Sequence, residues 1–216
     1  MKKLSKQQVK NFKKGAVALT LAAAMGLAGL SAFFTDSKTK VNEFTVGNVK
    51  QELIEKKWDE ATETGAHDNI TPNTTFDKDP KVKNTGTNSQ YVFMTVTVPK
   101  ADVVLADDAT GERKTTELFT YVTNTGWTKL DSKTTIGDDS NTYVYAYATG
   151  DTLTALDSDA ETPTLFDTIK FANIVENEKF AKDQLDVTVK SYGIQTTNLG
   201  ETTPEKVWDI VSKEAK

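Results

Sequence analysis

The sequence of 216 residues contains no cysteine and a single histidine, His67. The lack of cysteine excludes disulfide bonds, cysteine-ligated zinc or iron–sulfur clusters, and thiol catalysis. One histidine cannot supply an HExxH zinc site or a three-histidine zinc site, and it leaves little for a serine triad. Because His67 lies in a polar loop between predicted strands, we expect an exposed side chain there. The sequence therefore predicts no catalytic residue, no metal ligand and no cofactor.

Motifs for nucleotides and hydrolysis are also missing. The chain contains no GxGxxG, P-loop or GxSxG motif, so neither nucleotide binding nor α/β-hydrolase catalysis is indicated. Acidic clusters occur at residues 107–108, 138–139 and 157–161. None of them matches the D-x-[DN]-x-[DN]-G-x5-E calcium loop, and we expect solvated turns. Paired carboxylates could support glycoside hydrolysis, but no other feature of the sequence indicates it.

Positive charge is concentrated at the N-terminus. The first 32 residues contain six lysines and no acidic residue, whereas the whole chain has 26 basic and 31 acidic side chains and a net charge of −5. Residues 15–30 form an uncharged, mostly apolar run that is shorter than the roughly 20 residues of a spanning helix. A lysine-rich start followed by an apolar run predicts a secretory signal peptide at residues 1–32, cleaved between Ala32 and Phe33. A retained N-terminal anchor is the alternative.

Removal of residues 1–32 would change the charge balance. It would leave 20 basic and 31 acidic side chains, which gives a net charge of −11. Such a chain is not expected to bind nucleic acid, because the phosphates would repel it.

The remaining residues predict an all-β fold. The clearest strand covers residues 91–98, where Val92, Met94, Val96 and Val98 alternate with Tyr91, Phe93, Thr95 and Thr97, and Pro99 is expected to end it. Other predicted strands lie at residues 43–55, 118–123, 127–130, 142–149 and 185–196. Glycine and asparagine turns separate them, and no βαβ alternation is present. We expect residues 33–216 to form a single domain, a jelly-roll-like β-sandwich with one or two short helices.

Helices and aromatic side chains add detail to this prediction. Pro204 follows Thr203 as at a helix start, and Val207, Trp208, Val211 and Ala215 would then share one stripe. Residues 173–184 are expected to hold a short helix or an irregular connection. Trp58, Trp127 and Trp208 are predicted to be core residues or covers of strand ends. Tyr143, Tyr145 and Tyr147 could form an exposed ladder that binds sugars or another surface, but we expect them to face the core.

Three stretches together resemble one family. The first runs from Leu30-Ser31-Ala32-Phe33-Phe34-Thr35-Asp36 to Asn42-Glu43-Phe44-Thr45-Val46-Gly47-Asn48-Val49. The second is KDPxVxNTG at residues 78–86, preceded by Ile70-Thr71-Pro72, and the third joins Lys170-Phe171-Ala172-Asn173 to DVTVKSYGIQ at residues 186–195. The chain resembles the TasA/camelysin (CalY) family of secreted Gram-positive proteins over most of its length.

The resemblance implies a fibre subunit of an extracellular matrix or biofilm, located in the matrix or at the cell surface. It implies processing by the signal peptidase SipW and self-assembly by donor-strand exchange, with other matrix proteins or the cell surface as further partners. In such fibres the freed N-terminal segment pairs with the next subunit as a strand. The donor residues would be Phe33, Phe34, Thr35, Asp36, Ser37, Lys38, Thr39, Lys40 and Val41.

Two other functions stay open at this point. Members of the family are also labelled metallopeptidases, but this sequence has one histidine, no HExxH motif and no cysteine. We therefore do not expect protease activity, and a secreted camelysin-type peptidase is an alternative. A monomeric accessory protein or adhesin that binds a larger fibre or a host surface is the second alternative. For residues 33–41 the alternative to a donor strand is a frayed, disordered segment, and the monomer could have such a segment whether or not it acts as a donor.

Overall fold

A computed structural model describes residues 49–65, 70–175, 180 and 185–214 of the chain. All of them belong to one compact unit within Phe33–Lys216. The described part consists mainly of antiparallel strands with two short α-helices, so the predicted all-β sandwich is confirmed.

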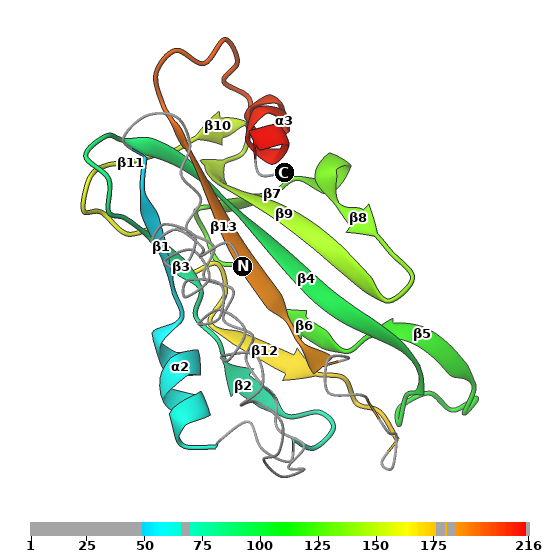
Figure 1. Ribbon diagram of the computed structural model, residues 1–216. Helices are drawn as coiled ribbons and strands as arrows, with labels where there is room; N and C mark the ends of the chain where they lie inside the picture. Colours follow the sequence, from blue (N-terminus) through cyan, green and yellow to red (C-terminus); the bar gives the residue numbers. More distant parts are fainter. Residues whose placement is uncertain (1–48, 66–69, 176–179, 181–184, 215–216) are drawn as a thin grey trace, which may run out of the picture. The chain divides into compact units, whose positions relative to one another are not determined.

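The larger sheet is built around one long strand, β4 (Gln90–Val104). This strand pairs with β9 (Ser140–Thr149) and with β13 (Thr188–Gln195), and Figure 1 shows β4 and β13 running side by side. Shorter strands extend the sheet: β5 (Arg113–Glu117) and β11 (Ala155–Leu156) pair with β4, whereas β7 (Trp127–Lys129), β8 (Thr135–Ile136) and β10 (Thr152–Leu153) pair with β9.

The opposite layer consists of two smaller sheets. One is the pair of β1 (Gln51–Ile54) and β3 (Lys81–Asn84), and the other has the order β2 (Thr75–Asp77), β12 (Thr168–Phe171) and β6 (Phe119–Tyr121). Alternate residues of both layers face each other and form the main core. Its buried members include Leu53, Val82, Val92, Met94, Val96, Phe119, Tyr145, Ile169, Phe171 and Val189. Burial of this apolar surface is the principal stabilising contribution of the sandwich.

Helix α3 (Pro204–Glu214) covers part of the other face of the larger sheet. Val207, Trp208 and Val211 are buried against a second core cluster that contains Phe93. The helix starts at Pro204 as predicted, because proline has no N–H to lose at the first helical position. The centroids of the Phe93 and Trp208 rings lie 5.6 Å apart. The strand predicted for residues 91–98 is confirmed as part of β4, and α3 covers its outer face at Phe93.

Several element boundaries differ from the prediction. β4 continues past Pro99 to Val104, because its pairing passes there from β9 to β5, and a missing N–H is tolerated at the change of partner. The strand predicted for residues 43–55 is described only from residue 49, and β1 covers Gln51–Ile54. Helix α2 (Lys56–Glu63) follows it and was not predicted. Between residues 173 and 175, Ile174 forms an isolated bridge with Leu105.

Candidate functional site

The residues predicted to act in export and assembly lie outside the described part of the chain. This applies to the cleavage pair Ala32 and Phe33, and it applies to His67. It also applies to the donor residues Phe33, Phe34, Thr35, Asp36, Ser37, Lys38, Thr39, Lys40 and Val41. The candidate site residues that the structure does describe lie on the strands, in the segments between them and on helix α2.

Lys78 and Asp79, from the KDPxVxNTG stretch, fasten helix α2 to the sandwich. The Lys78 side chain is 2 % exposed, and its ammonium lies 2.9 Å from the Glu55 carboxylate. The same ammonium lies 4.2 Å from the centroid of the Trp58 ring. Asp79 accepts a hydrogen bond of 2.9 Å from the backbone N–H of Lys57, which is at the first turn of α2. These contacts therefore hold helix α2 in place.

Asn84, from the end of the same stretch, organises two loops. Its side chain is fully buried, and the amide donates hydrogen bonds of 2.9 Å to the carbonyls of Asn88 and Leu156. Its side-chain oxygen accepts the N–H of Gly86 at 2.9 Å. A buried amide with all these partners is a structural anchor. The KDPxVxNTG pattern thus describes architecture, with a helix clamp at its start and a loop anchor at its end.

Tyrosines and a carboxylate form a hydrogen-bonded group on the inner face of β9. The hydroxyls of Tyr121 and Tyr145 are 2.8 Å apart, and Glu117 accepts hydrogen bonds from Tyr143 and, at 2.6 Å, from Asn141. Burial raises the pKa of Tyr143 to about 12, and the hydrogen bond to Glu117 adds to the shift. Burial and the neighbouring Tyr145 raise the pKa of Tyr121 even further.

The orientation of these tyrosines settles one expectation. Tyr145 is 3 % exposed, and Tyr143 and Tyr147 pack against the main core. The prediction that the three alternating tyrosines face the core is confirmed, and the sugar-binding ladder is not formed. The predictions for the tryptophans are also confirmed: Trp127 and Trp208 are buried, and Trp58 packs against the core.

The most unusual polar group lies between β1 and β13. We call Gln51, Gln90 and Ser191 the amide cluster. All three side chains are buried, with 1 %, 0 % and 2 % of their residue surfaces exposed, and the Gln51 amide donates a hydrogen bond of 3.1 Å to the Ser191 hydroxyl. The bond joins a strand of one layer to a strand of the other. Among the described residues, Gln51 Oε1, Gln90 Oε1 and Gln90 Nε2 have no hydrogen-bond partner.

Gly193 makes room for this cluster. A Cβ atom added at Gly193 would lie 2.5 Å from Gln90 Oε1 and 2.7 Å from Gln51 Oε1, which is closer than such atoms approach. The two glutamine side chains therefore occupy the space that any other residue would need. The sequence carried a usable signal for the cluster, because Gln90 continues the inward-facing series of Val92 and Met94 by two residues.

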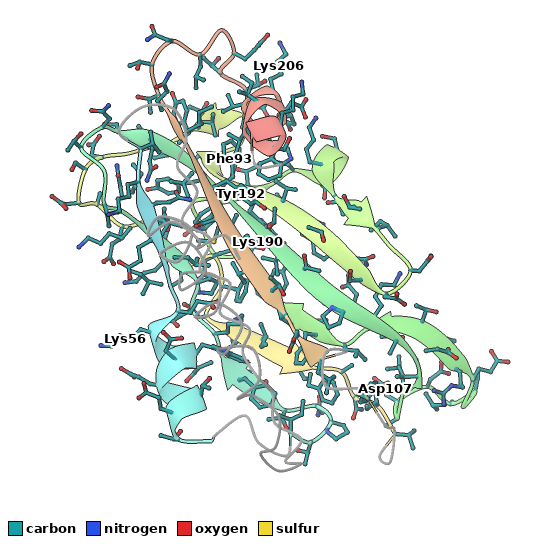
Figure 2. All side chains as sticks on the ribbon, viewed as in Figure 1. Lys56, Phe93, Asp107, Lys190, Tyr192 and Lys206 are labelled. Carbon is teal, nitrogen blue, oxygen red and sulfur yellow. The ribbon has the colours of Figure 1, made fainter. Side chains whose placement is uncertain are left out.

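The face of β13 that points away from the main core is partly covered by α3. Figure 2 shows Lys190 and Tyr192 on β13, with Phe93 close to Tyr192. The Tyr192 ring packs edge-on against Trp208 with a centroid distance of 5.1 Å, whereas Lys190 is exposed. The two faces of this strand therefore differ: an apolar contact with the helix on one, and the amide cluster on the other.

The chain matches no protein-family model, no curated protein and no solved structure. In the part of the chain that the structure describes, no group of three histidine, cysteine or acidic side chains could hold a metal ion. None of the described helices is long and apolar enough to cross a membrane.

Proposed function

We propose that the protein is a secreted, non-enzymatic fibre subunit of an extracellular matrix or biofilm, and that its copies join by donor-strand exchange. The donor is residues 33–41, released when a signal peptidase of the SipW type cuts between Ala32 and Phe33. The acceptor is the sandwich of a second copy. The mature protein lies in the matrix or at the cell surface, where other matrix proteins can join the fibre.

The observation that carries the proposal is the pairing of β1. Among the described strands, β1 pairs only with β3, and it meets β13 of the other layer through the side-chain bond from Gln51 to Ser191. A strand with one neighbour offers backbone N–H and C=O groups to an added strand. An extended segment from another chain can complete such a sheet through main-chain hydrogen bonds, while its side chains fill the adjacent core.

The sequence of the donor supports the same function. Phe33 and Phe34 would be the first residues of the cleaved chain, and each would contribute about 1.5–3 kcal/mol if it were buried in a partner. An uncleaved signal peptide would block this end. The resemblance to the TasA/camelysin family, carried by the stretches quoted above, is a second line of support.

Electron microscopy of the protein that starts at Phe33 tests the proposal. We expect fibres from this protein, no fibres from a variant that lacks residues 33–41, and no fibres from a precursor in which cleavage is blocked. Circular dichroism of the deletion variant should show the same β content as the parent, since the described strands begin at Gln51. Undiminished polymerisation of the deletion variant would contradict donor-strand exchange.

A further inference from the structure

The amide cluster contains three buried polar atoms without a partner. These are Gln51 Oε1, Gln90 Oε1 and Gln90 Nε2, none of which has a hydrogen-bond partner among the described residues. A buried polar atom that lacks a hydrogen bond is costly, and such atoms in native proteins call for a specific explanation. Three of them in one place, two being acceptors and one a donor, point to a polar ligand.

The cluster lies where the two layers of the sandwich meet. Gln51 shares the inward face of β1 with the core residue Leu53, and Gln90 shares the inward face of β4 with Val92. Ser191 is on β13 and pairs with Met94 of β4. Strands β1 and β13 therefore contribute one cluster member each, and Gln90 belongs to the strand that neighbours β13. A strand placed beside β1 would direct every second side chain toward these amides.

The proposed donor has a face that suits this environment. Successive residues of a strand point to opposite sides, so Phe33, Thr35, Ser37, Thr39 and Val41 would share one side. This side is uncharged and carries three hydroxyls, each of which can both donate and accept a hydrogen bond. Amide oxygens need donors and an amide nitrogen needs an acceptor, and hydroxyls supply both. The other side carries Phe34, Asp36, Lys38 and Lys40, which suits contact with solvent.

An exposed charge beside the cluster agrees with this orientation. Glu52 follows Gln51 on the outward side of β1. The outward side of the donor has two bases, Lys38 and Lys40, which can pair with this carboxylate.

We propose that the amide cluster of Gln51, Gln90 and Ser191 is the binding site for the hydroxyl side of the donor segment of a second copy. This inference rests on the proposed function, and it assigns the recognition to side chains in addition to the main-chain ladder. Thr35, Ser37 and Thr39 provide the hydrogen bonds that the two glutamines lack within the subunit. Because Gly193 has no side chain, it leaves the space that the two glutamine amides occupy.

The proposal is tested with the purified, processed protein and its Gln90→Met variant. Methionine keeps the length of the side chain and removes the amide. The melting temperature of the variant should be unchanged or higher, because a group without a partner is removed. Fibre growth followed by light scattering should be at least tenfold slower. The control is Thr97→Val, which removes a polar group from the opposite face of the same strand and should leave the growth rate within twofold.

Synthetic peptides provide a second test that uses the unchanged protein. A peptide with the sequence FFTDSKTKV should inhibit fibre growth and bind in isothermal titration calorimetry. The peptide FFVDVKVKV, in which valine replaces each hydroxyl residue, should bind at least tenfold more weakly. The Gln90→Met variant should lose this discrimination.

The outcomes separate the two proposals. If the parent protein neither polymerises nor binds FFTDSKTKV, donor-strand exchange is wrong and the cluster has no such ligand. If the parent polymerises but the variant grows at the parental rate, or the two peptides bind equally, only the role of the amide cluster is overturned. A melting temperature lowered by several degrees in Gln90→Met would also overturn it, since the amide would then be satisfied within the subunit.

Discussion

Buried polar side chains in this core are of two kinds, and their substitution should have opposite effects. Lys78 and Asn84 are buried with partners at hydrogen-bond distance, and they join segments that are distant in the sequence. Gln90 is equally buried, but its amide has no partner among the described residues. Loss of a satisfied group leaves its partners unpaired, whereas loss of an unsatisfied group removes a cost. Lys78 and Asn84 therefore stabilise the fold, whereas the amide of Gln90 is the group that we propose for binding.

We expect Lys78→Met to destabilise the protein by about 3–5 kcal/mol, because the Glu55 carboxylate would stay buried without its counter-ion. The Glu55 side chain is 14 % exposed. The free energy of unfolding is measured by urea titration, with circular dichroism as the probe. The double variant Lys78→Met, Glu55→Leu should recover most of the loss.

Lys56→Ala is the matched control for this prediction. Lys56 forms an ion pair of 3.7 Å with Glu60 on the surface of α2, where the two side chains are 76 % and 64 % exposed. Such a pair contributes less than about 1 kcal/mol, so the control should be nearly neutral. Equal losses for the two single variants would mean that the Lys78 clamp is not an important contact.

Gly193→Ala should destabilise the fold by about 1–3 kcal/mol, because the new methyl group would collide with two buried amides and force them to move. Gly200→Ala serves as the control, since a Cβ there would meet nothing within 4 Å. Thermal unfolding of both variants checks the prediction. A Gly193→Ala protein as stable as the parent would show that the glutamines can rearrange freely.

Alkaline pH should destabilise the protein through the partly buried Tyr121 and Tyr143. The pKa of Tyr143 is about 12 in the fold and that of Tyr121 is also raised, whereas unfolded tyrosine ionises near a pKa of about 10. A raised folded pKa means that the unfolded chain loses protons first, so stability is full below about pH 10 and falls as the pH rises above it. Absorbance at the tyrosinate band should show fewer ionised tyrosines in the folded protein than in urea. Ionisation of all six tyrosines near the normal pKa without unfolding would contradict this.

Helix α3 changes the environment of the outer face of the larger sheet. Without it, Phe93, Val144 and Ala146 would form an apolar outer face, whereas with it they belong to a second buried cluster. This explains why β4 has large apolar residues on both sides, although an antiparallel strand with one wet face would alternate between apolar and polar. The helix lies at one end of the sheet in Figure 1, next to β10.

Trp208→Ala should cost about 3–5 kcal/mol of unfolding free energy, since Trp208 is 9 % exposed and contacts both Phe93 and Tyr192. Lys213→Ala, an exposed position of the same helix, should change the stability by less than about 0.5 kcal/mol. Urea unfolding of both variants provides the measurement. A small loss for Trp208→Ala would show that α3 contributes little to the fold.

Charge acts over the whole molecule and bears on assembly. The proposed mature chain has 20 basic and 31 acidic residues, so copies of it repel one another at neutral pH. Salt weakens this repulsion, because the Debye length falls from about 30 Å at 0.01 M to about 10 Å at 0.1 M ionic strength. The contacts that we propose between donor and acceptor are mostly main-chain, hydroxyl and aromatic contacts, which salt disturbs less.

Fibre growth of the processed protein should therefore be several-fold faster at 0.1 M than at 0.01 M sodium chloride. Light scattering at a fixed protein concentration is the measurement. Growth that slows with added salt would mean that attraction between opposite charges, and not the repulsion of like charges, controls the assembly.

Long periodic segments made most of the fold predictable. The alternation at residues 91–98, 142–149 and 185–196 led to β4, β9 and β13, and the proline and apolar stripe after Thr203 led to α3. Short strands such as β2, β8, β10 and β11 have two or three residues, which is too few to show a period. Helix α2 was missed because none of its residues is buried and its attachment depends on Lys78 and Asp79, far away in the sequence.

By itself, the sequence determined the all-β class, the inward-facing series of β4 and β9, and the exclusion of thiol and multi-histidine chemistry, because these depend on composition and on local periodicity. Only the tertiary structure decided that KDPxVxNTG is a clamp and an anchor, and that Gln51, Gln90 and Ser191 meet around Gly193. Those contacts join residues as many as 140 positions apart, and chain folding alone brings them together. Whether a buried amide has a hydrogen-bond partner depends on these long-range contacts. The residues next to it in the sequence therefore do not reveal whether it has one.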